Sequence, residues 1–273
     1  MRTRTALSLA VLWLAAGPAA AAGMKLERER LFTTEGPGTV GFLKRRFDFQ
    51  HNFKDFTLNP AVDLTLILGV WDTIQVEGEA LLHNEMVSTF NATAVRQYDT
   101  LETAVKWAIL DQSKEDWFSL AVAGMIGRTD LKAVLKDPAF GIDGLSRHHF
   151  RNLGAYALVH YDTRWVTPSF QVTYDRYAID RNGPSHALTT PGLGLRLKVW
   201  ETRDAKVHLV GDYQLASFAL PGFHRAWGAG TQMMVGSPHV FSFFLSNTAG
   251  DTLPDVVVGV HETYYNFRCS YRF

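Results

Sequence analysis

Charged side chains alternate with aliphatic ones in several segments of the chain. In the clearest segment, Arg196 and Lys198 stand between Leu195, Leu197 and Val199. A β-strand places successive side chains on opposite faces, so the cations share one face and the aliphatic residues share the other. Burying such cations in a small β-sandwich costs several kcal/mol each unless they are paired, whereas a wet lumen accommodates them at little cost. The pattern therefore predicts a charged lumen behind an apolar outer wall.

The candidate functional residues are the charged residues that share the polar face of their strands. They are Lys44, Arg46, Glu77, Glu79, Lys106, Asp175, Arg196, Lys198, Asp212, Arg268 and Arg272. We expect the cations of the first and last strands to form a positive wall opposed to a negative wall that carries the two glutamates of the third strand. Such a field would select polar or zwitterionic solutes for passage or binding. The alternative is that these charges pair with one another and fill a narrow lumen, giving a closed barrel with a structural or surface-interaction role.

No arrangement of residues indicates catalysis. Twelve-stranded outer-membrane phospholipases use a Ser nucleophile, a His base and an Asn that orients it, but no Ser-x-x-x-Asn strand motif follows a well-placed histidine here. We therefore expect no catalytic residues, with a lipid-active enzyme as a distant alternative. His148, His149 and Asp143 match no specific metal-ligand spacing, so neither a metal nor another cofactor is expected. We place the histidine pair in an outer loop.

The alternating pattern recurs often enough to predict twelve strands. The expected strands are 39–53, 60–71, 73–83, 98–110, 117–128, 149–161, 164–178, 190–200, 205–216, 223–235, 239–247 and 262–273. An even number suits a single-chain bacterial barrel, which has short inner turns and longer outer loops; ten or fourteen strands also fit. The long outer connections would be 84–97, 129–148, 179–189 and 248–261. In the second of them, Asp130 is suited to N-cap a short helix that reaches Lys136.

Aromatic residues lie near the ends of the expected strands. Five tryptophans and two tyrosines have this placement: Trp71, Trp107, Trp165, Trp200, Trp227, Tyr161 and Tyr265. Aromatic girdles of this kind flank the apolar band of membrane barrels at both interfaces.

The last ten residues alternate as well. Tyr265, Phe267, Tyr271 and Phe273 share one face with Cys269, and polar residues separate them. This segment resembles the closing strand of bacterial outer-membrane β-barrel proteins, which ends in Phe and is read by the barrel-assembly machinery. The resemblance implies an all-β, transmembrane, antiparallel up-and-down barrel in the outer membrane, with the assembly machinery and outer-membrane lipid as partners.

The first residues have the pattern of a secretory signal peptide. Arg2 and Arg4 precede an apolar run that Gly17-Pro18 interrupts, and small residues end at Ala22. The run is too short to span a membrane as a helix. We expect residues 1–22 to be removed, leaving 23–273 as one barrel domain.

Composition narrows the classes of partner. The chain has 27 basic and 27 acidic residues, which is no electrostatic signature of nucleic-acid binding. Its single cysteine excludes an intramolecular disulfide. The composition identifies neither a solute nor an oligomeric state.

Four segments resemble a bacterial family of membrane-bound β-barrels that is known only as a domain of unknown function. They are Leu101 to Ser113, Thr167 to Arg181, Gly192 to Gln214 and His239 to Gly250. The resemblance implies the barrel and the outer membrane, but it brings no established activity and no catalytic residues.

Overall fold

The computed structural model describes residues 38–54, 57–88, 94–133, 146–179, 185–215, 224–236, 239–248 and 263–273. The expected signal peptide at residues 1–22 lies outside the described residues, so its cleavage stays a prediction. No helix in these ranges is long and apolar enough to cross a membrane.

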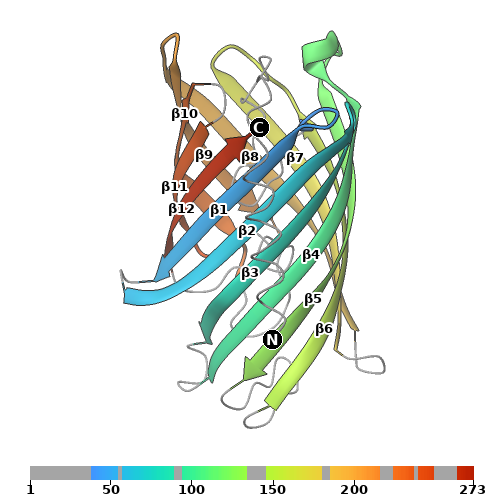
Figure 1. Cartoon of the computed structure of the whole chain (residues 1–273), viewed down its shortest axis with the longest axis vertical. Coiled ribbons are helices and arrows are strands. Elements are labelled where there is room, and N and C mark those ends of the chain that lie inside the picture. The colour runs from blue at the N-terminus through green and yellow to red at the C-terminus, as the bar shows by residue number, and fades with distance from the viewer. Residues whose placement is uncertain are drawn as a thin grey trace.

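Twelve antiparallel strands form one closed barrel in which each strand pairs with its neighbours in the chain and the last pairs with the first (Figure 1). The strands are β1 (Arg45–Lys54), β2 (Thr57–Trp71), β3 (Ile74–Ser88), β4 (Ala94–Leu110), β5 (Ser119–Ala133), β6 (Ser146–His160), β7 (Val166–Ile179), β8 (Ser185–Glu201), β9 (Ala205–Gln214), β10 (Trp227–Val235), β11 (His239–Ser246) and β12 (Tyr264–Arg272). A 3-10 turn, η2 (Gln112–Lys114), connects β4 to β5. The predicted fold class and strand number are confirmed.

Alternation along the strands divides the wall into two faces. On β8, Leu193 and Leu195 are 49% and 42% exposed on the outside, whereas Arg196 is 2% exposed on the inside. The same contrast recurs on β9, where Leu209 is exposed and Asp212 is buried. A wall with apolar side chains outside and polar side chains inside is suited to hydrocarbon rather than to water.

The barrel closes between β1 and β12, which lie side by side in Figure 1. Arg46 is paired in register with Arg272, and Phe49 with Cys269. Beyond the paired strands, the backbone N–H of Phe273 donates to the carbonyl of Arg45 at 3.1 Å, and the reciprocal bond measures 3.2 Å. Closure thus satisfies backbone groups that would otherwise lie unpaired at two sheet edges in the membrane.

Several strands are longer than predicted at the end with the longer connections. β5 continues to Ala133 and β6 begins at Ser146, so the expected outer loop 129–148 shrinks to residues 134–145, which lie outside the described residues. The predicted helix that begins at Asp130 is wrong, because Asp130 lies in β5 and pairs with His149. Placing His148 and His149 in a loop is wrong for the same reason.

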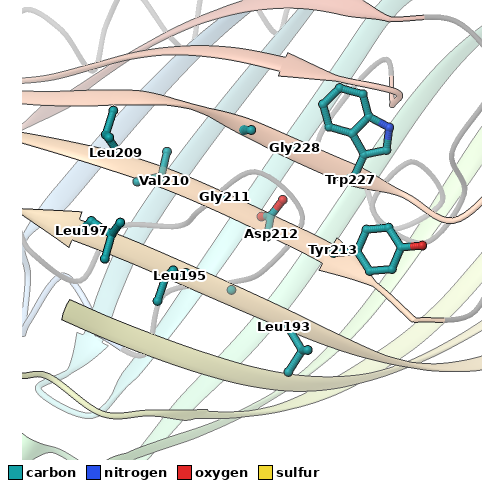
Figure 2. Close-up of a pocket in the computed structure, with 12 residues that line it drawn as sticks. Leu193, Leu195, Leu197, Leu209, Val210, Gly211, Asp212, Tyr213, Trp227 and Gly228 are labelled. Carbon is teal, nitrogen blue, oxygen red and sulfur yellow. The ribbon is translucent and has the colours of Figure 1, made fainter.

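Tryptophan side chains are exposed at the end of the barrel that has the short turns. Trp71, Trp107, Trp165 and Trp200 are between 50% and 61% exposed. Trp227 lies at the opposite end of the wall, near Tyr213 on the neighbouring strand (Figure 2). Both ends of the apolar wall therefore carry amphipathic rings, which favour the membrane–water interface.

Because the outer face contacts lipid, a charged residue introduced there should lower the free energy of unfolding by an amount that depends on its depth in the membrane. Leu195 lies five positions from Trp200, roughly 13 Å along the axis of a barrel with strands tilted by about 40°. We expect Leu195→Arg to lower the free energy of unfolding in lipid vesicles by about 2–4 kcal/mol, since this position lies near the bilayer midplane. Urea titration with a gel-shift assay of the folded form measures the change.

Val199→Arg is the matched control, because Val199 lies on the same face of the same strand but close to the turn. Its expected cost is about 0–1 kcal/mol. Equal costs at the two positions would contradict the assigned faces and depth.

Candidate functional site

A continuous row of polar side chains crosses the inner wall. Successive members occupy directly paired positions on six adjacent strands, and we call this set the polar row: His208, Gln232, Ser242, Arg268, Gln50 and Asp63. All six are at most 4% exposed. Because each is paired in register with the next, their side chains lie close enough to interact across the strands.

Arg268 is the central cation of the polar row. Its Nε donates a hydrogen bond to Gln50 Oε1 at 2.9 Å. Its guanidinium carbon lies 5.6 Å from the centre of the Phe244 ring, close enough for a cation–π contact. The predicted lumen-facing position of Arg268 thus places a buried cation between a neutral amide and an aromatic ring.

Two neutral members of the polar row have oxygen atoms without a partner. Gln232 Oε1 and Ser242 Oγ are buried, and neither has a hydrogen-bond partner in the part of the chain that the structure describes. The two residues are paired with each other on β10 and β11. A buried polar atom without a partner costs about 1–3 kcal/mol, so this stretch of the lumen favours a polar group that supplies donors.

Two of the predicted acidic residues, Glu77 and Glu79, lie on β3. Glu77 Oε1 accepts a hydrogen bond from Gln75 Nε2. The Nζ of Lys106 lies 4.0 Å from the same glutamate oxygen. Glu79 is paired in register with Glu102, placing two carboxylates on the inner face of adjacent strands. Gly127 leaves room for Glu102, since a Cβ at this position would lie 2.6 Å from its Cγ.

The expected opposition of a positive wall and a negative wall is wrong. Arg46, Arg268 and Arg272 lie on β1 and β12, and only β2 separates these strands from β3 in the closed order. In a ring of twelve strands, the strand opposite β1 is β7. The basic and acidic sectors are therefore neighbours, and Asp48 lies within the basic sector at 2.7 Å from Arg46.

The remaining predicted residues are dispersed. Asp175 and Asp212 are buried on β7 and β9, and Asp212 is paired with glycines on both sides. Lys198 turns toward the short-turn rim, where its Nζ lies 2.9 Å from Glu201 Oε2. Lys44 precedes β1, and its N–H donates to the carbonyl of Gly41 at 3.2 Å.

Neutral polar residues of the site were absent from the sequence prediction. Gln50, Gln232 and Ser242 carry no charge and were not considered, although they occupy the same alternating positions as the predicted ions. The two-residue alternation of inward and outward positions would have identified them as inward-facing residues. Their alignment into one row depends on strand register, which alternation alone does not fix.

The predicted assembly residues lie on the outer face. The rings of Tyr271 and Phe273 lie 5.0 Å apart, and Phe267 packs against Phe243 at 5.0 Å. Tyr265 is also exposed on this face. Recognition of these four residues by the assembly machinery stays a prediction.

A shallow groove on the outer wall is a weaker candidate for the functional site. Figure 2 shows leucines on β8 and β9 along it, with Tyr213 and Trp227 at one end. Its lining is mainly apolar, so it faces hydrocarbon as part of the membrane-exposed wall. Among the described residues, no group of His, Cys, Asp and Glu is placed to hold a metal ion.

No family model and no curated protein matches the chain. Among solved structures, the β domain of the Bordetella autotransporter BrkA is 13% identical, with 84% of this chain and 98% of that one covered and a TM-score of 0.49. The KdgM porin bound to disordered oligogalacturonate is 10% identical (84% and 99% covered, TM-score 0.46). The NalP translocator domain of Neisseria meningitidis is 12% identical (99% and 94% covered, TM-score 0.46).

The chain's own strand pairing gives it the architecture of a bacterial outer-membrane β-barrel. Membership of the β-barrel family of unknown function stays a prediction.

The hydrogen bond between Arg268 and Gln50 predicts coupling between these residues. We expect Arg268→Met to lower the free energy of unfolding by about 1–3 kcal/mol, because the buried Gln50 oxygen loses the hydrogen bond from Arg268. Urea titration in lipid vesicles measures this change.

The double variant Gln50→Met with Arg268→Met should cost less than the sum of the two single changes, since it removes both partners of the bond. Additive costs would show that the bond does not couple the two positions.

Proposed function

We propose that this protein resides in the bacterial outer membrane, with its short turns toward the periplasm, and that it binds and passes a small polar solute along the polar row. The apolar outer face and the aromatic residues near both interfaces support the location. The longer connections at the opposite end support the orientation, since outer-membrane barrels place their long loops outside the cell. This function requires only that the lumen admit a solute.

The pair of Gln232 and Ser242 carries the proposal. Their buried oxygens lack hydrogen-bond partners among the described residues, and Arg268 is paired with Ser242 on the next strand. A solute that carries hydroxyl or amide groups would donate to the two oxygens and accept from the guanidinium. The polar row thus has the chemistry to recognise a small hydroxylated or zwitterionic molecule.

A barrel with a closed lumen is the second candidate. The inner side chains are nearly inaccessible to solvent: Gln171 and Arg196 are 2% exposed and Asp175 is 0% exposed. Ion pairs such as Arg46 with Asp48 also hold inner charges together. This burial favours a structural role, so conductance is the property that separates the two candidates.

We do not propose an enzyme. Ser119 is paired in register with His160, and His160 Nε2 lies 2.8 Å from Asp162 Oδ1. Ser119 is fully buried, and its hydroxyl accepts the backbone N–H of Gln112 at 3.1 Å. A hydroxyl held in this way stabilises the turn after β4, and a substrate carbonyl has no access to it.

Planar-bilayer recording of the purified protein tests passage. We expect a small conductance whose ion selectivity depends on the buried charges of both signs in the lumen. Replacing Arg196 and Arg268 by Gln should lower the anion-to-cation permeability ratio by roughly a factor of two or more, since two positive charges leave the path.

Arg203→Gln is the matched control, since Arg203 is an exposed cation in the turn between β8 and β9. This variant should conduct as the wild type does. Absence of any conductance from folded protein would refute passage and favour the closed barrel.

A further inference from the structure

Three arginines lie close together on the outer face of β5, β6 and β7. We call Arg128, Arg151 and Arg176 the outer arginine cluster; all three are exposed. Arg128 is paired directly with Arg151, and Arg176 is paired with Leu153, the next outward residue of β6. The cluster is separate from the lumen and from the polar row, because its residues occupy the alternate positions of their strands.

The cluster lies at the height where the apolar band ends. Along the chain, ten positions separate each arginine from a residue at or next to the short-turn end of its strand, namely Phe118, Tyr161 and Val166. Ten positions span roughly 25 Å along the axis at about 3.3 Å per residue and a tilt near 40°, which is the height of the apolar band of a membrane barrel. The guanidinium groups therefore lie at the level of lipid headgroups at the long-loop end.

Apolar side chains lie directly below the cluster. Ile126 is 64% exposed, Leu153 is 49% exposed and Tyr174 is 38% exposed, each two positions closer to the middle of the wall on its strand. A molecule that binds the arginines from the membrane side would thus place an apolar part against these residues. This arrangement suits a lipid better than a free anion.

Arg128 and Arg151 differ in their ion pairs. Arg128 Nε lies 2.8 Å from Asp130 Oδ1, which also lies 2.6 Å from His149 Nδ1. Asp99 on β4 is paired in register with Asp130 on β5 and supplies the second carboxylate of this surface. Arg151 has no ion pair in the described part of the chain, and like charges at directly paired positions are destabilising.

We propose that the outer arginine cluster binds the phosphate of an anionic lipid in the leaflet at the long-loop end. Guanidinium groups bind phosphate oxygens through paired N–H donors, and an anion between Arg128 and Arg151 removes their mutual repulsion. The acyl chains of the same lipid lie against Ile126 and Leu153. The cluster is thus a lipid-binding site on the outside of the barrel, independent of any solute in the lumen.

Native mass spectrometry of the detergent-solubilised protein, titrated with phosphatidic acid, tests the site. The variant R128Q/R151Q/R176Q should retain this lipid about tenfold more weakly than wild type, since three donors to the phosphate are lost. Phosphatidylcholine, whose headgroup is zwitterionic, should bind both proteins weakly and equally. Inorganic phosphate at millimolar concentration should not displace the lipid, because it lacks the apolar part.

The matched control is K114Q/R164Q/R203Q, which removes three exposed cations at the short-turn end. This control should bind phosphatidic acid as the wild type does. Equal loss in both triple variants would overturn the site, as would full displacement by inorganic phosphate. A gel-shift assay confirms that each variant is folded. Should the cluster variant fail to fold, Arg151→Gln alone removes the cation that has no ion pair and should weaken binding about threefold; unchanged binding would overturn the proposal.

Discussion

The closure of one sheet on itself is the constraint on which the rest of this structure depends. Hydrocarbon offers no partner to a backbone N–H or C=O, so a sheet that spans a membrane cannot leave an edge unpaired. Pairing of β12 with β1 removes both edges and makes every strand two-faced. One face must then suit lipid, and all polar side chains in the spanning region must share the other. The alternation of leucines with charged residues along β8 reflects this requirement.

The enclosed face sets the chemistry of the lumen. Side chains that meet inside a narrow barrel must pair, pack or bind a solute, because an isolated buried polar atom is unfavourable. Arg46 with Asp48 and Arg268 with Gln50 are pairs of this kind. Glycines assist where a long side chain must lie along the wall: a Cβ at Gly192 would lie 2.6 Å from Gln214 Oε1. Gln232 and Ser242 are the neutral members of the polar row whose oxygens such pairing does not satisfy among the described residues, which is why the proposed function rests on them.

Much of the fold could be predicted from the sequence, because alternation reports directly on a two-faced wall. The twelve strands were identified, and residues such as Arg196 and Asp212 lie on the inner face. Strand ends were predicted less well: beyond the apolar band a strand no longer needs lipid-facing residues, so Asp130 in β5 was taken for the start of a helix. The positions of charges around the ring were also mispredicted, since they depend on strand order and register. The outer arginine cluster was missed because its members come from three strands and only pairing brings them together.

A disulfide across the seam between β1 and β12 tests the register of barrel closure most directly. Phe49 is paired with Cys269 across the seam, and both lie on the outer face. Directly paired positions have Cα atoms about 4.5–5.5 Å apart, within the range that a disulfide spans. Oxidation of the folded Phe49→Cys variant should therefore give an intramolecular disulfide with the native Cys269, seen as a reducible shift on a denaturing gel. Gln50→Cys, one residue along and on the inner face, should give none. A disulfide in Gln50→Cys together with none in Phe49→Cys would contradict the closure and the two faces that follow from it.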